Sequence, residues 1–197
     1  MSIVAIVLAA GRGARFAEAS PGGPPKMMAP VDGVPMIRRT VESLVAGGVD
    51  RSVVVVSGDQ AIVIARALSG LAVTCVVNPD PDRGMFSSVQ CGVVAAADAG
   101  ICVLLPGDMP FVQPATVARL LSAAATTGRT AVPRLDGSPG HPVVCAPGLR
   151  DRILAAEAGA RLDHLIREED VLQVDVTDAG VRRDVDRPAD LPRPVAP

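Results

Sequence analysis

Four short apolar runs, separated by stretches with helical spacing, constrain the fold of this sequence most strongly. The runs are rich in Val, Ile and Leu and lack strict alternation, which is typical of strands covered on both faces. They span Ile3–Ala9, Ser52–Ser57, Ala72–Val77 and Ile101–Leu105, and the helical stretches between them span Met36–Ala46, Gln60–Leu68 and Met85–Ala97. Alternating strands and helices predict an α/β sheet with right-handed crossovers, whose ligands bind at the carboxyl ends of the strands.

Further elements are predicted along the second half of the chain, in the order helix, strand, turn, strand, two helices and strand. They span Pro114–Ala124, Thr130–Arg134, Asp136–Gly140, Pro142–Cys145, Gly148–Ala156, Arg161–Glu168 and Val171–Val176. The proline-rich end at 192–197 is expected to fray. Neither an internal repeat nor a linker divides the sequence, so we expect one domain over residues 1–197.

Composition narrows the classes of partner. A net charge of −2 with 19 scattered basic residues argues against a protein that binds a nucleic-acid backbone. Three Phe, with no Tyr or Trp, leave few rings on which single-stranded bases could stack. We therefore expect no nucleic-acid partner, whereas a small anionic ligand needs only two or three well-placed cations.

The first apolar run and the cysteines favour a cytoplasmic protein. The run lacks a preceding basic region, is too short to span a membrane and continues into a glycine-rich loop. We interpret it as a buried strand, and we expect no membrane partner. Cys75, Cys91, Cys102 and Cys145 lie in apolar runs without a CxxC pair, so we expect buried free thiols, not disulfides or a zinc site.

The loop after the first strand carries two glycines and two cations. Gly11 and Gly13 allow a tight turn and bring backbone N–H groups toward an anion, and Arg15 and Lys26 follow. The pattern lacks the third glycine and the ribose carboxylate of a dinucleotide site, and two prolines before Lys26 exclude the Walker pattern. Taken alone, the loop fits a phosphate site and a solvated surface loop equally well.

The whole stretch from Leu8 to Phe16, Leu-Ala-Ala-Gly-Arg-Gly-Ala-Arg-Phe, followed by Pro25-Lys26, resembles the signature of nucleotidyltransferases of the molybdenum cofactor type, the MobA-like NTP transferases. Later segments resemble the family's other motifs in the same order, at 78–92, 106–110, 137–142 and 184–191. The resemblance implies a Rossmann-like, three-layer fold with a mixed, mainly parallel sheet, as in nucleotide-diphospho-sugar transferases. The sequence departs from the family pattern at Ala17, where a glycine is usual, and in the longer loop at 18–24.

The resemblance also implies roles for individual residues. The nucleotide-binding positions are Leu8, Ala9, Ala10, Gly11, Gly13, Arg15, Lys26, Asn78, Gly84, Ser88 and Gly92. The acceptor-binding positions are Gly140, His141 and Pro142, the magnesium ligands are Asp108 and Asp186, and the catalytic positions are Arg15, Lys26 and Asp108. Several of these residues also have a plain structural interpretation, since a serine that opens a helix can cap it and an isolated Asp can be a turn residue. We expect His164 to be an ordinary helix residue, and Asp80 and Asp82 to be solvated loop charges.

The implied reaction explains which residue types are present. A phosphate monoester attacks the α-phosphorus of a nucleoside triphosphate, and pyrophosphate leaves. Both reactants are anions, so positioned cations and Mg²⁺ should supply most of the catalysis. The attacking phosphate is already ionised near neutral pH, so no general base is needed and the lack of a Ser/His or His/Asp constellation is expected.

One residue of the first loop bears on the choice of nucleotide. Guanylyl enzymes of the family resemble Leu-Ala-Gly-Gly here, and cytidylyl enzymes resemble the Leu-Ala-Ala-Gly of this chain. A methyl group at Ala10 narrows a base pocket and favours a pyrimidine. The implied reaction is transfer of CMP from CTP to molybdopterin, and the implied protein partner is a molybdenum hydroxylase apoenzyme.

Three alternatives remain open from the sequence. The first is a guanylyl or other nucleotidyltransferase with a different phosphorylated acceptor, such as a sugar phosphate or phospholactate. The second is a non-catalytic carrier that helps to insert a cofactor, against which the presence of both Asp108 and Asp186 argues. The third is a nicotinamide-dependent dehydrogenase, against which the missing glycine and ribose carboxylate argue.

Overall fold

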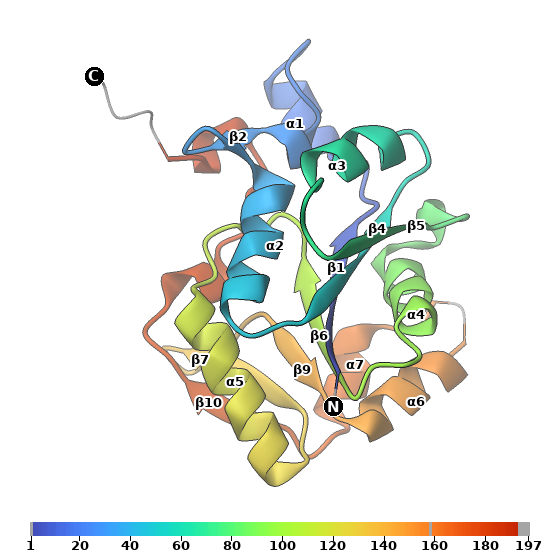
Figure 1. Cartoon of the computed structure of the whole chain (residues 1–197), viewed down its shortest axis with the longest axis vertical. Coiled ribbons are helices and arrows are strands. Elements are labelled where there is room, and N and C mark those ends of the chain that lie inside the picture. Colours follow the sequence, from blue (N-terminus) through green and yellow to red (C-terminus); the bar gives the residue numbers. More distant parts are fainter. Residues whose placement is uncertain (1, 158, 193–197) are drawn as a thin grey trace.

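The computed structural model describes residues 2–157 and 159–192, and its centre is an eight-stranded sheet (Figure 1). The strands of this sheet are β1 (Ile3–Ala9), β4 (Arg51–Val56), β5 (Val73–Val77), β6 (Ile101–Pro106), β7 (Ala131–Leu135), β8 (Ser138–Pro139), β9 (Val143–Cys145) and β10 (Leu172–Asp175). Their order is β10-β7-β9-β6-β1-β4-β5, with β8 paired to β7. The four apolar runs form the parallel half, and β9 pairs antiparallel with β6 and β7. The predicted mixed, mainly parallel sheet is confirmed.

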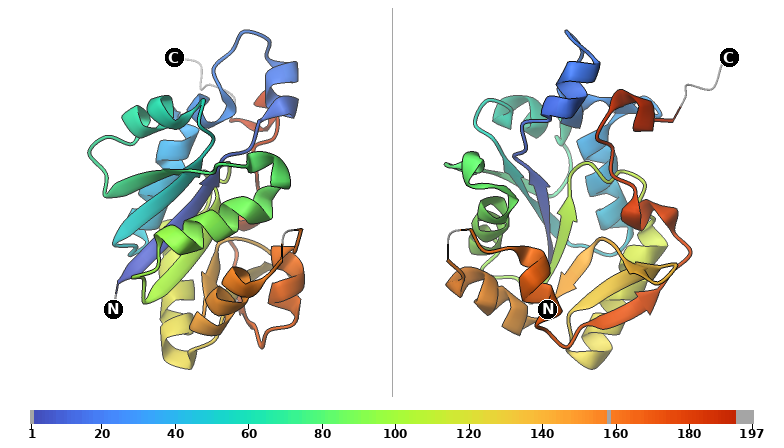
Figure 2. Two further views of the ribbon diagram at one scale, coloured as in Figure 1. Left: turned by 90° about the vertical axis from the view of Figure 1, so that its right-hand side faces the viewer. Right: turned by 180° about the vertical axis from the view of Figure 1, so that it is seen from behind.

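Helices cover both faces of the sheet, as Figure 2 shows. They are α2 (Met36–Ala46), α3 (Ala61–Ala67), α4 (Met85–Ala95), α5 (Pro114–Thr127), α6 (Pro147–Ala155) and α7 (Leu162–Arg167), whereas α1 (Ala14–Ala19) lies beyond the carboxyl ends of the strands. Successive residues of β1 point to opposite faces, so Ala5 and Val7 pack with α2, α3 and α5, whereas Val4 and Ile6 pack with α4, α6 and α7. The central strands are therefore apolar on both sides, as their lack of alternation predicts. Among the described helices, none combines the length and apolarity needed to cross a membrane.

The main differences from the sequence prediction lie between Gly13 and Met36. Helix α1, a 3₁₀ turn at Lys26–Met28 and a small hairpin of β2 (Pro30–Val31) and β3 (Val34–Pro35) occupy a region for which we predicted only a loop. Helix α1 buries only Phe16, so it leaves no helical periodicity to detect. Residues 193–197 of the end expected to fray lie outside the described residues.

A buried carboxylate, Asp178, anchors the C-terminal segment to the N-terminus of helix α5. Asp178 accepts hydrogen bonds of 2.8 Å from the Gln113 backbone N–H, from the Thr116 hydroxyl and from the Gly180 backbone N–H. The first two bonds cap the N-terminus of α5. After this anchor the chain turns back, so that residues 184–190 lie beside the N-terminal loop at the carboxyl ends of the strands (Figure 1).

Gly92 allows α4 to lie close to the sheet. A Cβ atom at this position would lie 2.2 Å from Cγ2 of Ile6 and 3.1 Å from Cγ2 of Val55. The structure therefore places Gly92, which the sequence suggested as a nucleotide-binding position, on the face of α4 that packs against strands β1 and β4.

We predict that Gly92→Ala lowers the free energy of unfolding by about 1–3 kcal/mol, because the added methyl overpacks the core. Urea denaturation measures this change. Gly148→Ala is the matched control, since Gly148 also lies in a helix and an added Cβ would meet no atom within 4 Å. Equal stability of the two variants would contradict the packing argument.

Candidate active site

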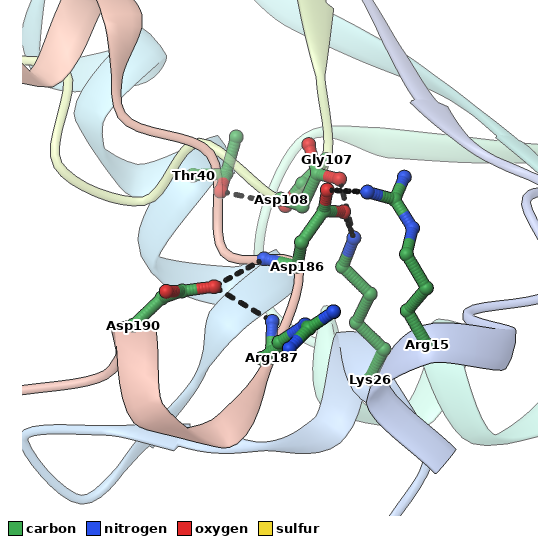
Figure 3. A network of polar contacts seen from close by, with 8 residues as sticks. All are labelled: Arg15, Lys26, Thr40, Gly107, Asp108, Asp186, Arg187 and Asp190. Carbon is green, nitrogen blue, oxygen red and sulfur yellow. Dashed lines mark hydrogen bonds and ion pairs between the residues drawn. The ribbon is translucent and has the colours of Figure 1, made fainter. Parts of the chain in front are cut away.

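Four charged side chains meet at the carboxyl edge of the sheet (Figure 3). The Lys26 ammonium donates to Asp108 Oδ2 at 2.7 Å and to Asp186 Oδ1 at 3.0 Å. The Arg15 guanidinium forms an ion pair with the other oxygen of Asp186. The exposed fractions of the side chains are 11% for Lys26 and 19% for Asp108, so this pair is well shielded from water. The structure thus brings together the two predicted cations and the two predicted metal ligands.

Two hydrogen bonds to the backbone of Gly107 hold the neighbouring Asp108 where strand β6 ends. The Gly107 N–H donates to the Leu8 carbonyl at 2.9 Å, and the Thr40 hydroxyl donates to the Gly107 carbonyl at 2.9 Å. An added Cβ at Gly107 would lie 3.1 Å from the Leu8 carbonyl oxygen, so a small residue suits this turn. The carboxylate that follows is therefore held at the end of a buried strand.

The C-terminal segment delivers Asp186 to the same place. The Val185 N–H donates to the Asp108 carbonyl at 2.9 Å, which ties the two segments together one residue away from Asp186. Asp190 then accepts from the backbone N–H groups of Asp186 at 3.0 Å and Arg187 at 2.7 Å (Figure 3). Asp190, which the sequence motif contains but which received no role, thus orders the loop that carries Asp186.

Lys26 reaches the cluster despite the lengthened loop. The residue opens the 3₁₀ turn after that loop and packs against Gly13, whose left-handed backbone has a φ of 60°. An added Cβ on Gly13 would lie 3.1 Å from Cβ of Lys26, so the glycine also leaves room for the lysine stem. Burial alone would lower the pKa of Lys26, but hydrogen bonds and charge attraction from Asp108 and Asp186 outweigh it and raise the pKa. The ammonium therefore stays protonated.

A cavity of about 310 Å³ adjoins this cluster. Its walls include seven of the predicted positions, namely Leu8, Gly11, Gly13, Lys26, Gly84, Ser88 and Asp108. Ala9 and Ala10 lie in the apolar clusters on opposite faces of the sheet, directly below the first loop. The remaining predicted nucleotide position, Asn78, is buried and bonded to Ser87 and Ser88.

A second, larger cavity of about 610 Å³ lies on the α7 side and shares Gly84 and Met85 with the first. Its lining is mainly apolar and includes Phe86, Leu162 and Ile166, with Arg83, Arg161 and Arg167 as cationic members. Gly140 and His141, two of the predicted acceptor positions, also line it, and Pro142 follows them buried behind a cis peptide bond. The wall from α7 was not expected, because no sequence motif links that helix to the loop at 140–142.

His141 presents a neutral imidazole to this second cavity. Its backbone N–H donates to the Val181 carbonyl at 2.8 Å, and an added Cβ on Gly140 would lie 2.4 Å from that same oxygen. Burial lowers the pKa of His141, although the charges of Asp108 and Asp184 act in the opposite direction. The buried Nδ1 atom has no hydrogen-bond partner among residues 2–157 and 159–192.

The carboxylate oxygens of the charged cluster suit a cation such as Mg²⁺ that also binds water or substrate phosphates. Within the described part of the chain, no group of three or more His, Cys, Asp or Glu side chains could hold a metal ion. Two carboxylates, Asp108 and Asp186, do converge on one point, which Lys26 occupies. Mg²⁺ commonly takes one or two carboxylates and completes its shell with water and substrate phosphates. The residues therefore fit Mg²⁺ bound together with a phosphate ligand.

The residues for which we expected structural roles lie outside this cluster. Cys102 and Cys145 are buried free thiols, as predicted, whereas Cys75 and Cys91 are free thiols that are only partly buried, because they lie near the edge of the sheet and on the outer side of α4. His164 lies on α7 with an exposed side chain. Asp82 is exposed but pairs with Arg12 at 2.6 Å, which links the first loop to the 80–84 turn.

Comparison with known proteins gives one family match and several relatives. The model of the MobA-like NTP transferase domain matches residues 5–174. A probable molybdenum cofactor guanylyltransferase of Natronomonas pharaonis is 30% identical, over 95% of this chain and 94% of its own length. A nicotine blue oxidoreductase of Paenarthrobacter nicotinovorans is 32% identical, over 93% and 92%. A 2-C-methyl-D-erythritol 4-phosphate cytidylyltransferase of Nocardia farcinica is 36% identical over 68% of this chain, which spans 56% of that protein.

Solved structures share the architecture. A nucleotidyl transferase from Methanothermobacter superposes with a TM-score of 0.78 at 28% identity, covering 96% of this chain and 94% of that one. Rv0371c of Mycobacterium tuberculosis has the same fold, with a TM-score of 0.80 at 24% identity over 96% of this chain and 95% of its own. The family match, the fold and the ordered motifs agree, and the chain belongs to the family of MobA-like NTP transferase domains.

Proposed function

We propose that this protein is a magnesium-dependent nucleotidyltransferase that moves CMP from CTP to a molybdopterin-like phosphate acceptor and releases pyrophosphate. The observation that carries the proposal is the cluster of Arg15, Lys26, Asp108 and Asp186 beside two adjoining cavities. The smaller cavity, under the first loop, suits the nucleotide. The larger cavity, which Gly140 and His141 line, suits the acceptor.

The charges of the cluster are suited to binding a triphosphate and stabilising the negative charge of the leaving pyrophosphate. Lys26 and Arg15 lie where they can bind the triphosphate and offset the charge that develops on the leaving pyrophosphate. Asp108 and Asp186 would hold Mg²⁺, which reduces the repulsion between the two anionic reactants when it is bound. Among residues 2–157 and 159–192, no serine or threonine hydroxyl is hydrogen-bonded to a histidine or carboxylate beside the cluster, in keeping with an acceptor phosphate that attacks directly.

The choice of CTP rests on the first loop. The relatives themselves differ, since one is named a cytidylyltransferase and another a guanylyltransferase. The sequence Leu8-Ala9-Ala10-Gly11 favours cytidylyl transfer by its resemblance to that branch. With molybdopterin as acceptor, the product would be a cytosine dinucleotide cofactor, and a molybdenum hydroxylase apoenzyme would be the partner that receives it.

We predict that pyrophosphate appears when the protein is incubated with CTP, Mg²⁺ and molybdopterin, and that ATP, GTP and UTP give much less. Sugar phosphates serve as control acceptors and should give no release above background. The measurement is the initial rate of pyrophosphate formation. Release with GTP and not with CTP would refute the cytidylyl assignment.

We predict that Asp108→Ala lowers the rate of pyrophosphate release about 100- to 1000-fold, because it removes a partly buried carboxylate that would hold the metal ion and that pairs with Lys26. Asp151→Ala is the matched control, since Asp151 is an exposed carboxylate on α6. Unchanged turnover in the Asp108 variant would instead favour a non-catalytic cofactor carrier.

We predict that Lys26→Ala binds Mn²⁺ more tightly than the wild type in the absence of nucleotide, by about tenfold or roughly 1.4 kcal/mol. The ammonium of Lys26 lies between both carboxylates and opposes a second cation there. Electron paramagnetic resonance measures free Mn²⁺ directly, and a structure of the mycobacterial relative is itself a complex with manganese. Arg12→Ala, which removes a cation outside the cluster, should leave Mn²⁺ affinity unchanged, and equal affinities of the Lys26 variant and the wild type would contradict the metal site.

A second candidate function follows from the relative named nicotine blue oxidoreductase, which matches nearly the whole chain. Redox chemistry with a nicotinamide cofactor would need a dinucleotide site, and the first loop lacks its third glycine. Oxidation of NADH or NADPH without pyrophosphate release from any triphosphate would favour this candidate over nucleotidyl transfer.

A further inference from the structure

Arg183 connects the two segments that carry the carboxylates of the charged cluster. Its guanidinium lies over the Phe111 ring, 4.0 Å from the ring centroid, and Phe111 belongs to the loop that Asp108 begins. The same guanidinium donates a 3.0 Å hydrogen bond to the backbone carbonyl of Asp190. Phe111 packs against a buried cluster that includes Val185, so its ring offers a fixed surface. Arg183 therefore ties the loop after strand β6 to the far end of the C-terminal segment.

A single oxygen of Asp190 holds the peptide that carries Asp186 (Figure 3). Its Oδ2 atom accepts hydrogen bonds from the backbone N–H groups of Asp186 at 3.0 Å and of Arg187 at 2.7 Å. Because both bonds end on the same atom, one carbonyl-type oxygen at this place is enough to accept them. The position of this oxygen can therefore be tested separately from the charge of the carboxylate.

We propose that Arg183 is a positioning residue for the metal site, and that it acts through Asp190 to hold Asp186 beside Asp108. The inference rests on the proposed function, because it assumes that the two carboxylates bind a metal ion together. Val185 is fully buried and its N–H donates to the Asp108 carbonyl, which anchors the loop just before Asp186. The bond from Arg183 to Asp190 joins the start of the loop to its end and so anchors the other side.

These backbone anchors matter most when ligands occupy the site. In the structure, Lys26 and Arg15 also hold Asp186 through its side chain. Both cations would pair with the triphosphate in the proposed reaction, so the position of Asp186 would then depend on the loop that carries it. Loss of an exposed cation–π contact together with a hydrogen bond from a charged donor changes a binding constant about three- to tenfold.

The test measures the dissociation constant of Mn²⁺ by electron paramagnetic resonance, with CTP present and the acceptor left out. A titration of CTP alone corrects for Mn²⁺ that free nucleotide binds. We expect Arg183→Ala to weaken Mn²⁺ binding about three- to tenfold. Arg182→Ala is the matched control and should keep the wild-type affinity, because Arg182 is an exposed neighbour of the same charge that has neither contact among the described residues.

The Mg²⁺ dependence of pyrophosphate release gives a second measurement. In Arg183→Ala, the half-saturating Mg²⁺ concentration should rise by a similar factor, while the rate at saturating Mg²⁺ stays within about twofold of the wild type. A merely less folded protein would lower the rate at saturation and leave the half-saturating concentration unchanged. A thermal melt establishes that the variant is folded, and if it is not, substitutions at Asp190 decide the question.

Two substitutions at Asp190 separate the position of its oxygen from its charge. Asp190→Asn keeps one oxygen that can accept both backbone bonds, so Mn²⁺ affinity should stay within about twofold of the wild type. Asp190→Ala removes the acceptor and should weaken Mn²⁺ binding about tenfold. Adding Arg183→Ala to Asp190→Ala should cause little further loss, because Arg183 acts through Asp190.

The outcomes separate this inference from the proposed function. Mn²⁺ affinity that is unchanged in a folded Arg183→Ala variant overturns the role of Arg183 and leaves nucleotidyl transfer intact. Equal losses in Asp190→Asn and Asp190→Ala also overturn the inference, because charge and not position is then decisive, and so do additive losses in the double variant. Wild-type protein that binds no Mn²⁺ with CTP present overturns the metal site itself, and with it the proposed magnesium-dependent transfer.

Discussion

The shared ion pair of Lys26 with Asp108 and Asp186 is the interaction around which the carboxyl edge of the sheet is organised. It joins three segments that are far apart in the sequence, and it does so where little water reaches. Two carboxylates this close would repel each other strongly without a cation between them. Removing one partner of such a shielded cluster leaves an uncompensated charge, so each member constrains the others. The cluster therefore holds the N-terminal loop and the C-terminal segment in the same place.

That convergence depends on features of the fold remote from the charges. Parallel neighbours β1 and β6 end side by side, which places the first loop next to Asp108. Two contacts place Asp186 beside Lys26. Asp178 anchors the C-terminal segment on α5, and the Val185 N–H donates to the Asp108 carbonyl. Both anchors are hydrogen bonds from backbone or hydroxyl groups to buried acceptors, which are costly to leave unpaired. The geometry of the charged site is thus set by neutral contacts around it.

The sequence predicted the parts of the structure that leave a local pattern. The buried strand Ile3–Ala9 was recognisable as a continuous apolar run, helix Met36–Ala46 from its helical spacing, and Asp108 from the resemblance of residues 106–110 to a family motif. The short helix α1 buries one residue and the network of Asn78 joins a strand end to a helix start, so neither leaves a periodic signal. Gly92 matched a motif, but its contact with Ile6 depends on how α4 crosses the sheet, which only the tertiary structure reveals. The wall of the larger cavity from α7 was missed for the same reason.

If the protein binds Mg²⁺ and a nucleoside triphosphate as proposed, the arrangement of charges would couple the two binding events. Without ligand, the two cations neutralise the two carboxylates, and Lys26 occupies the point where a metal ion would sit. A metal ion by itself would have to displace an ammonium, and a triphosphate by itself would have to draw that ammonium away from two carboxylates. With both bound, Asp108 and Asp186 would hold the metal ion and Lys26 would pair with the phosphates, so that each charge keeps a partner. Binding of the metal ion and of the nucleotide would then be thermodynamically linked, since each would favour the state to which the other binds. Lys26, which neutralises both carboxylates in the structure, would in this way keep the cluster ready for a metal–nucleotide complex.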